Sequence, residues 1–260
     1  MKVVILCGGT GTRLKEETEY KPKPLVMVGD QPILWHIMKL YSHYGFNDFI
    51  LCLGYKGDMI KDYFLKYDEL AHDFTLKLGT GEKQIIHHEK KTPNWNITFA
   101  NTGLDCMTGS RIARIKKYID PDEEFFLTYG DAVANVDIES LYQYHKEKGK
   151  AVTVTGIQPP NPFGIIKAEE GIVKTFVEKP QSVDWANGGF FVCNKSIFNE
   201  LSPEGSMVFE EKPLRTVAAR GDLAIYQHNN FWHCVDTFKH LEGLNALYNK
   251  ESRPWMVWEN

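Results

Sequence analysis

A glycine-rich segment near the start of the chain carries the residues best suited to hold phosphate groups. The apolar run Lys2–Cys7 leads directly into Gly8–Gly11, which contains three glycines. Glycine lets the backbone adopt positive φ angles and bring its N–H groups close to a ligand. Two cations, Arg13 and Lys23, follow within a short stretch. A plain tight turn would not explain these cations, so the pattern favours a polyphosphate ligand.

Two common phosphate-binding loops do not fit this segment. A P-loop needs Gly-Lys followed by Ser or Thr, and the chain contains no such triplet. A dinucleotide fingerprint needs a glycine at the sixth position from Gly9, where Leu14 stands instead. No acidic residue follows the apolar run Leu51–Leu53 directly. A dehydrogenase is therefore disfavoured.

Strands and helices alternate through the first half of the chain. Apolar runs predict the strands Lys2–Cys7, Asp48–Leu53 and Phe125–Tyr129. Helical spacing predicts helices at Ile33–Tyr44, Gly57–Phe64, Ile112–Ile119 and Ile138–Lys148, the last of them capped by Asp137. This alternation is typical of an α/β fold with a doubly wound, mostly parallel sheet. In such a sheet, ligands bind at the carboxyl ends of the strands.

The rest of the chain reads as additions to this sheet. The polar, extended stretch Phe74–Ala100 indicates β-hairpins inserted into the main sheet. After residue 150 we expect strands at Ala151–Gln158, Gly164–Lys167, Ile172–Glu178, Gly189–Cys193 and Leu223–Gln227, and helices at Val208–Arg220 and Thr237–Lys250. No flexible linker interrupts the chain, so we predict one domain, 1–260. The apolar tail Pro254–Trp258 should dock on this domain or on a neighbouring one.

Composition excludes several classes of function. A net charge of −4 implies no strongly basic face, which disfavours a nucleic-acid partner. No stretch approaches the roughly 20 apolar residues of a membrane span, and the first residues do not resemble a signal peptide. We therefore expect a cytoplasmic protein without a membrane partner. The five cysteines are odd in number and lack C-x-x-C spacing, which favours reduced, buried thiols.

The segments Gly8–Leu14 and Lys21–Leu25 together resemble the signature of the sugar-phosphate nucleotidyltransferases. A glycine loop alone would be a weak signal, but further strings support the resemblance in order over essentially the whole chain. They are Pro32–Lys39, Gly54–Gly57, Asn101–Gly103, Met107–Arg111, Tyr129–Asp131, Phe176–Pro180, Asn187–Phe191 and Phe231–Trp232. The resemblance implies a Rossmann-like nucleotidyltransferase fold, with residues 1–150 as the nucleotide-binding half. Residues 151–260 would then form the sugar-phosphate-binding half, a sugar-binding lobe with the C-terminal helix.

Within this family the chain resembles the branch that transfers a cytidylyl group from CTP to α-D-glucose 1-phosphate, giving CDP-glucose and pyrophosphate. In that reaction a sugar-phosphate oxygen attacks the α-phosphorus in line. Because two polyanions must meet, catalysis would be mainly charge neutralisation and positioning. The resemblance also implies Mg²⁺ and a homo-oligomer, with six subunits as the expected number. CDP-glucose would then serve dideoxyhexose synthesis for surface polysaccharide such as the lipopolysaccharide O-antigen.

The resemblance assigns two catalytic cations. Arg13 would grip the leaving pyrophosphate, and Lys23 would bridge the phosphates at the reacting centre. Arg111 would contact the nucleotide, although it could equally be the first-turn arginine of a basic helix. The other implied nucleotide-binding residues are Leu6, Gly8, Gly9, Thr10, Gly11, Thr12, Cys106, Thr108 and Gly130. Cys106 stands where a small hydroxyl residue is expected near the base.

Two aspartates are the candidate metal ligands. Asp131 follows the predicted strand Phe125–Tyr129, at the sheet edge where an α/β fold places a metal ligand. Mg²⁺ binds few carboxylates directly and completes its shell with phosphates and water. By resemblance Asp236 supplies the second carboxylate, and its alternative role is the N-cap of the helix that follows it. Ala132 replaces a glycine that is common in the family, whereas the neighbouring carboxylate is kept.

The resemblance places the sugar phosphate in the second half of the chain. Lys179 would hold its phosphate, and Glu178 and Asn187 would take sugar hydroxyls. Gly188 would leave room for the ring. Two alternatives stay open: the same chemistry with UTP or dTTP, and a non-catalytic nucleotide-sugar sensor. A sensor should have lost an essential charged group, whereas all five candidate charges are present.

Overall fold

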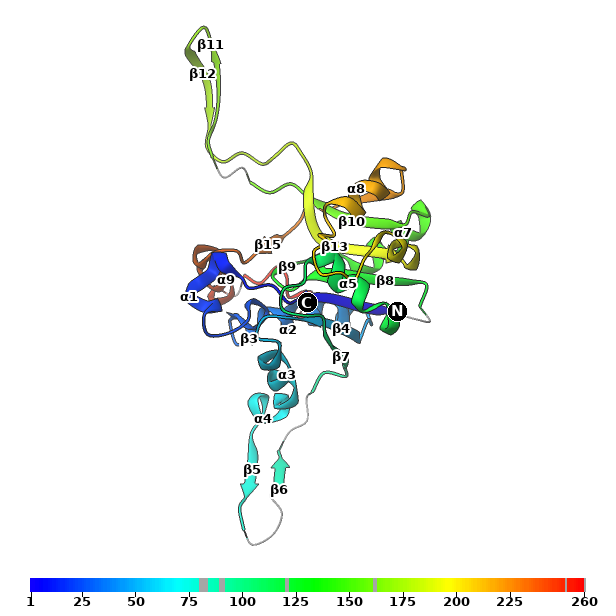
Figure 1. Cartoon of the computed structure of the whole chain (residues 1–260). Helices are drawn as coiled ribbons and strands as arrows, with labels where there is room; N and C mark the ends of the chain where they lie inside the picture. The colour runs from blue at the N-terminus through cyan, green and yellow to red at the C-terminus, as the bar shows by residue number, and fades with distance from the viewer. Residues whose placement is uncertain (80–83, 89–91, 120–121, 161–162, 251, 260) are drawn as a thin grey trace.

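A seven-stranded mixed sheet forms the centre of the computed structural model, which describes residues 1–79, 84–88, 92–119, 122–160, 163–250 and 252–259 (Figure 1). Its strands are β1 (Lys2–Cys7), β4 (Asp48–Leu53), β7 (Asn96–Asn101), β8 (Glu124–Tyr129), β10 (Val152–Ile157), β13 (Ala186–Asn194) and β14 (Leu223–Gln227). Their order across the sheet is β14-β10-β13-β8-β1-β4-β7. Only β13 runs antiparallel to its neighbours, β8 and β10. The predicted mostly parallel α/β sheet is confirmed, and both halves of the chain contribute strands to it.

Helices cover both faces of this sheet. Successive residues of a strand point to opposite faces, and in β1 both sets of side chains are apolar and buried. Val3 and Ile5 of β1 pack in one core cluster, whereas Val4 and Leu6 pack in the other. The first cluster also takes residues from α2 (Ile33–His43), α7 (Ile138–Lys148) and α9 (Phe238–Asn249). The second takes residues from α5 (Thr108–Arg114), α6 (Lys116–Ile119) and α8 (Lys212–Ala219). The sheet is therefore doubly wound.

Two helices differ from their predicted bounds. The predicted helix Ile112–Ile119 begins earlier, at Thr108, and is split into α5 and α6. The predicted helix Val208–Arg220 begins only at Lys212. Residues 205–210 instead pair with the start of α5, where the Ser110 hydroxyl accepts hydrogen bonds from backbone N–H groups of this segment. Pro213 lies in the first turn of α8, where its missing N–H costs nothing.

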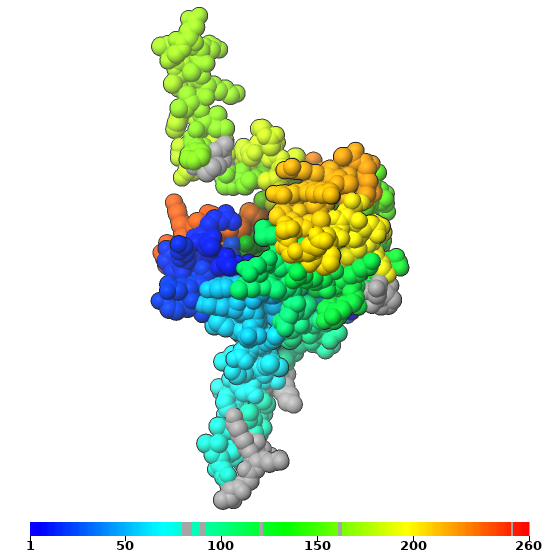
Figure 2. All heavy atoms as spheres, in the orientation of Figure 1, coloured from blue at the N-terminus to red at the C-terminus, as the bar shows by residue number. Residues whose placement is uncertain are grey.

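Two hairpins extend from the body of the molecule in opposite directions (Figures 1 and 2). One consists of β5 (Phe74–Lys77) and β6 (Gln84–His87), and the other of β11 (Ile165–Glu169) and β12 (Ile172–Val177). Each forms a separate two-stranded sheet. The hairpin predicted within 74–100 is thus present, but it lies outside the main sheet, which only β7 of that stretch joins.

The remaining elements are short and lie mostly around the sheet. They are η1 (Thr12–Leu14), α1 (Lys15–Thr18), η2 (Lys23–Leu25), β2 (Met27–Val28), β3 (Gln31–Pro32), α3 (Gly57–Leu65), α4 (Tyr67–Ala71), β9 (Ala132–Ala134), η3 (Lys195–Glu200), β15 (Trp232–Cys234) and η4 (Val257–Glu259). All five cysteine thiols are free, and four of them are buried. Across the described ranges, every helix is too short or too polar to cross a membrane.

The apolar C-terminal tail docks on its own domain, against helix α2. Trp255 is 1% exposed, and its Nε1–H donates to Nδ1 of His36 over 3.4 Å. The opposite ring nitrogen of His36 donates to the carbonyl of Val28 over 2.9 Å. This arrangement uses the neutral imidazole, and burial lowers the pKa of His36 to about 4. One of the two predicted docking modes of the tail is therefore confirmed.

The His36 contact predicts a loss of stability on acidification. A histidine in the unfolded chain titrates near pH 6.5, so the unfolded state binds more protons between pH 4 and 6.5. The free energy of unfolding should therefore fall by up to about 3 kcal/mol as pH drops through this window. His36→Gln, which keeps a donor and an acceptor, should flatten that decline in urea titrations at pH 7, 6 and 5. His43→Gln, on the exposed side of the same helix, is the matched control. An identical decline in His36→Gln would contradict this interpretation.

Candidate active site

The glycine loop, residues 8–11, lies at the carboxyl end of β1 and takes its shape from two neighbours. Gly11 adopts a left-handed conformation, with φ of 64°, which favours glycine. The Thr18 hydroxyl bonds to the carbonyls of Gly11 and Leu14 over 3.0 and 2.8 Å. At Gly8 a Cβ atom would lie 2.2 Å from a guanidinium nitrogen of Arg111. The loop therefore needs glycine at its first position because Arg111 packs directly against it.

Arg111 joins the ends of three strands. Its guanidinium donates to the carbonyl of Gly8 after β1 over 3.0 Å, and to that of Leu53 at the end of β4 over 3.2 Å. After β7 it donates to the hydroxyl of Thr102 and the carbonyls of Gly103 and Leu104 over 2.7 to 3.2 Å. The side chain is buried, and burial lowers its pKa. Arg111 is thus more than a first-turn helical arginine, because it holds the glycine loop against the sheet.

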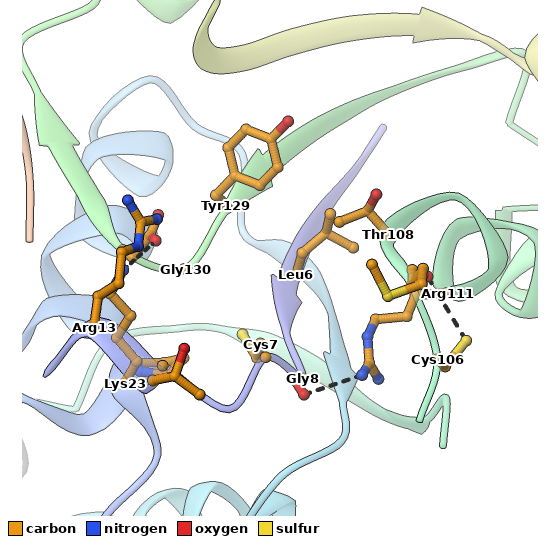
Figure 3. Close-up of a pocket in the computed structure, with 16 residues that line it drawn as sticks. Leu6, Cys7, Gly8, Arg13, Lys23, Cys106, Thr108, Arg111, Tyr129 and Gly130 are labelled. Carbon is orange, nitrogen blue, oxygen red and sulfur yellow. Dashed lines mark hydrogen bonds and ion pairs between the residues drawn. The ribbon is translucent and has the colours of Figure 1, made fainter. Parts of the chain in front are cut away.

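A cavity of about 320 Å³ opens between this loop and helix α5 (Figure 3). Figure 3 shows Arg13 and Lys23 on one side of it and Arg111 and Cys106 on the other. Its lining residues are Leu6, Cys7, Gly8, Gly9, Gly11, Thr12, Arg13, Lys23, Pro24, Cys106, Met107, Thr108, Arg111, Tyr129, Gly130 and Asp131. Every nucleotide-binding residue predicted from the sequence except Thr10 lies in this lining.

Lys23 forms the charged centre at one end of the cavity. Its ammonium lies 2.6 Å from Oδ2 of Asp131 and 2.8 Å from Oδ1 of Asp236. Burial opposes the charge on Lys23, but the carboxylate of Asp131 outweighs it and raises the pKa of the lysine. Burial likewise acts against the charge on Asp236, but Lys23 lowers the pKa of that carboxyl. Arg13, whose side chain is 72% exposed, pairs with Asp236 over 2.9 Å.

The two predicted metal ligands meet at this centre. Asp131 lies between β8 and β9, and Asp236 follows β15, which pairs with β9. Ligand atoms of Asp131, Cys234 and Asp236 all lie within 4.8 Å of one another, a group that could hold a divalent metal ion. The N-cap of α9 is Thr237, whose hydroxyl accepts from the backbone N–H of residue 240. Asp236 is therefore free of the capping role that the sequence left open.

The residues predicted to bind the sugar phosphate lie outside the lining of the glycine-loop cavity. Glu178 and Lys179 follow β12 at the base of its hairpin, where both side chains are more than half exposed and lie 3.8 Å apart. Asn187 and Gly188 lie on β13, and the carbonyl of Gly188 accepts from the indole of Trp232 over 2.8 Å. Within the described residues, none of these four belongs to the nucleotide cavity's lining.

A second cavity of about 590 Å³ is lined in part by Asp236. Its lining comes from the segments 157–160 and 228–236, together with Gln181 and His240. Trp232 supplies an aromatic surface to this cavity, and several amide and imidazole side chains also line the cavity. Asp236 therefore lines the second cavity and pairs with Arg13 and Lys23, which line the first.

Sequence reasoning missed two residues that the structure brings to the site. Tyr129 belongs to the quoted string Tyr129–Asp131, which was a usable signal, and its ring lines the nucleotide cavity. Glu210 had no signal, since it falls inside the stretch predicted as a helix. Its carboxylate accepts hydrogen bonds from Tyr129 and from Thr108. Cys106 is buried with its thiol directed to the carbonyl of Met107 over 3.7 Å.

This arrangement of a glycine loop, cations and paired carboxylates at one sheet edge defines an α/β protein built to bring phosphate groups together. The chain belongs to the nucleotidyl transferase family, since the family model described as Nucleotidyl transferase matches residues 2–251. "Probable glucose-1-phosphate cytidylyltransferase" of Bacillus subtilis (strain 168) is 48% identical over 258 residues, covering 99% of this chain and 100% of that protein. Glucose-1-phosphate cytidylyltransferase of Salmonella typhi is 45% identical over 261 residues, covering 100% of both chains.

The fold is also similar to that of solved structures. HddC from Yersinia pseudotuberculosis matches with a TM-score of 0.69 and 22% identity. The match covers 95% of this chain and 99% of that one. At this identity the likeness concerns the fold alone.

The Arg111 contacts predict that lysine cannot replace this arginine. Lysine has three donors on a single nitrogen, which cannot reach acceptors after β1, β4 and β7 together as the planar guanidinium does. A hydrogen bond from a charged group contributes about 1.5–3 kcal/mol, so the loss of even one in Arg111→Lys should lower the free energy of unfolding by about that amount. Chemical denaturation measures this loss, with the exposed Arg215→Lys as the matched control. Equal stability of Arg111→Lys and wild type would show that the interactions joining the strand ends are unimportant.

Proposed function

We propose that this protein transfers a cytidylyl group from CTP to α-D-glucose 1-phosphate, producing CDP-glucose and pyrophosphate. The observation that carries the proposal is the cluster of Lys23, Asp131 and Asp236 at the end of the glycine-loop cavity. The full-length similarity to proteins named for this reaction supports the choice of substrates. The uridylyl and thymidylyl alternatives differ only in the base. A non-catalytic sensor is disfavoured because Arg13, Lys23, Asp131, Lys179 and Asp236 are all retained.

In the proposed reaction a phosphate oxygen of glucose 1-phosphate attacks the α-phosphorus of CTP. The new P–O bond forms as the bond from the α-phosphorus to the bridging oxygen breaks, and the electron pair leaves with pyrophosphate. The Lys23 ammonium contacts two carboxylates. Incoming phosphates can share this ammonium while the lysine stays at the site. Arg13 is exposed enough to exchange its carboxylate partner for the leaving pyrophosphate. Both cations would stabilise charge that shifts during the reaction.

Asp131 and Asp236 would hold Mg²⁺ in the working enzyme. Two carboxylates from neighbouring loops suit a hard cation that takes its other ligands from phosphates and water. When bound, the metal would neutralise charge on the α-phosphate and on the incoming sugar phosphate. Lys23 would move from between the two carboxylates toward the phosphates. Its ammonium would then face negative phosphates, and the carboxylates of Asp131 and Asp236 would face the positive metal ion.

Residues of the second half of the chain would bind the sugar phosphate. Asn187 and Gly188 lie on β13, beside Tyr129 of the nucleotide cavity. We assign sugar hydroxyls to Asn187 and to Glu178, and the phosphate to Lys179. Glu178 and Lys179 lie at the base of the β11–β12 hairpin, outside the glycine-loop cavity, so their assignments rest on the resemblance.

The β11–β12 hairpin supports a homo-oligomer. Ile165 pairs with Val177 and Ile166 pairs with Phe176, so apolar pairs lie on both faces of the hairpin. All four side chains are at least 41% exposed. An isolated two-stranded hairpin is at best marginally stable in water. We propose that this surface packs against a second copy of the chain.

The proposed reaction predicts a clear preference among nucleotides. With glucose 1-phosphate and Mg²⁺, pyrophosphate release should be faster with CTP than with UTP, dTTP, ATP or GTP. Asp131→Asn removes one charge from the metal group and should lower kcat at least 100-fold with CTP, because metal and phosphate charges would be poorly balanced. Asp58→Asn, an exposed carboxylate on α3, is the control. Turnover with UTP or dTTP instead would contradict the cytidylyl assignment.

The hairpin predicts which substitutions separate the subunits. Replacing Ile166 and Phe176 together by glutamate should shift sedimentation velocity from the oligomer to a smaller species, because buried charges oppose the apolar contact. Lys167→Glu, on the same strand, changes charge without removing apolar surface and should leave the oligomer intact. A monomeric wild-type protein, or an unchanged oligomer in the double variant, would contradict the proposal.

A further inference from the structure

Glu210 lies between the nucleotide cavity and strand β13. Its Oε2 accepts from the hydroxyl of Thr108, which lines the cavity, over 2.7 Å. Its Oε1 accepts from the hydroxyl of Tyr129, which also lines the cavity. The Tyr129 oxygen in turn accepts from Nδ2 of Asn187 over 3.2 Å. One carboxylate therefore connects a nucleotide-side residue with the strand assigned to the sugar.

The segment that carries Glu210 is firmly anchored. The Ser110 hydroxyl accepts from the backbone N–H groups of Gly205 and Met207, each over 3.1 Å. Phe209 is fully buried in the core beneath α5, and its N–H donates to the hydroxyl of Thr108 over 2.9 Å. The carboxylate next to such an anchor has a defined position and can orient the groups that donate to it.

The donor and acceptor in each hydrogen bond around Glu210 are fixed. A hydroxyl has one proton, and both Thr108 and Tyr129 give theirs to Glu210. Because the Tyr129 proton is given to Glu210, the phenol oxygen can act toward Asn187 only as an acceptor. Asn187 must then present its amide nitrogen to Tyr129, and its oxygen accepts from the N–H of Gly189 over 2.9 Å. The amide of Asn187 is thereby fixed in one of its two orientations.

We propose that Glu210 is a positioning residue that couples the two substrate sites, by orienting Thr108 toward the nucleotide and, through Tyr129, Asn187 toward the sugar. The identity of the two ligands rests on the proposed function. The coupling itself rests on the hydrogen bonds. It does not require Glu210 to touch either substrate.

Glutamine at position 210 is the sharpest test because it keeps the shape of glutamate and changes only the pattern of donors. Its oxygen can accept from Thr108 or from Tyr129, but its nitrogen is a donor that faces the other hydroxyl. One of the two hydroxyls must therefore turn away. Glu211→Gln, the next residue along the chain and exposed, is the matched control.

Titration calorimetry with CTP and, separately, with glucose 1-phosphate measures both sites without requiring turnover. Glu210→Gln should weaken both ligands, each about tenfold, since hydrogen bonds to charged groups are among the stronger ones. Thr108→Val should weaken mainly CTP, and Tyr129→Phe mainly glucose 1-phosphate. In turnover these losses should appear in the matching KM values. A Glu210→Gln protein with a lowered Tm but wild-type affinity for both ligands would overturn the proposal, because Glu210 would then act only on the fold.

A double-mutant cycle keeps the proposal testable even if Glu210→Gln does not fold. The cycle follows the affinity for glucose 1-phosphate in all four proteins. Thr108→Val frees the Glu210 carboxylate to turn, so Tyr129→Phe should weaken glucose 1-phosphate less in the Thr108→Val background than in the wild type. The combined loss of affinity should be several-fold smaller than the product of the two single losses. Losses that simply multiply would contradict coupling through Glu210.

Pyrophosphate release by the wild-type protein separates this inference from the proposed reaction. If the wild type binds both ligands but releases no pyrophosphate, the proposed reaction fails while the binding data still decide the role of Glu210. If the wild type turns over and Glu210→Gln keeps both affinities and both KM values, only the role of Glu210 fails.

Discussion

The position of Lys23 between two carboxylates is the interaction on which the rest of the site depends. Its ammonium is held within 2.8 Å of both Asp131 and Asp236, which lie far apart in the sequence. Close approach of two carboxylates is unfavourable unless a cation lies between them. The lysine offsets the repulsion between the two aspartates and holds them in place. The pairing of β9 with β15 brings the two aspartates close enough for this arrangement.

The same constraint explains why the site lies at the carboxyl edge of the sheet. β1 delivers the glycine loop to this edge, and β8 delivers Asp131. Arg111 then fastens the loop to the ends of β4 and β7, so that the loop cannot move independently of the sheet. A nucleotide bound here would meet a rigid set of backbone groups on one side and the Lys23 cluster on the other. Such preorganised charge is what a reaction between two polyanions requires.

Local signals predicted the sheet and most of the residues that line the glycine-loop cavity. Continuous apolar runs mark β1, β4 and β8, and the glycines and cations of the loop lie close together in the sequence. The resemblance assigned Arg111 a contact with the nucleotide but did not predict that it joins strand ends. Its five acceptors come from three strand ends that are distant along the chain. Glu210 was not predictable. Its segment has a helical pattern of apolar residues, but the tertiary contact with Ser110 outweighs that local preference.

The position of the sugar-phosphate residues also depends on tertiary structure that sequence patterns do not contain. Lys179 follows a strand, as expected, but that strand belongs to a projecting hairpin rather than to the main sheet. Asn187, in contrast, lies on β13 and is joined to the nucleotide cavity through Tyr129 and Glu210. These hydrogen bonds connect the glycine-loop cavity with β13.

The central claim is that this site joins a sugar-phosphate oxygen to the α-phosphorus of CTP. Glucose 1-phosphate labelled with ¹⁸O in its phosphate tests it most directly, with the products followed by ³¹P NMR and mass spectrometry. The account predicts that all the label appears in CDP-glucose, including the oxygen that bridges the two phosphorus atoms, and none in pyrophosphate. Label in pyrophosphate, or a product other than CDP-glucose, would contradict it.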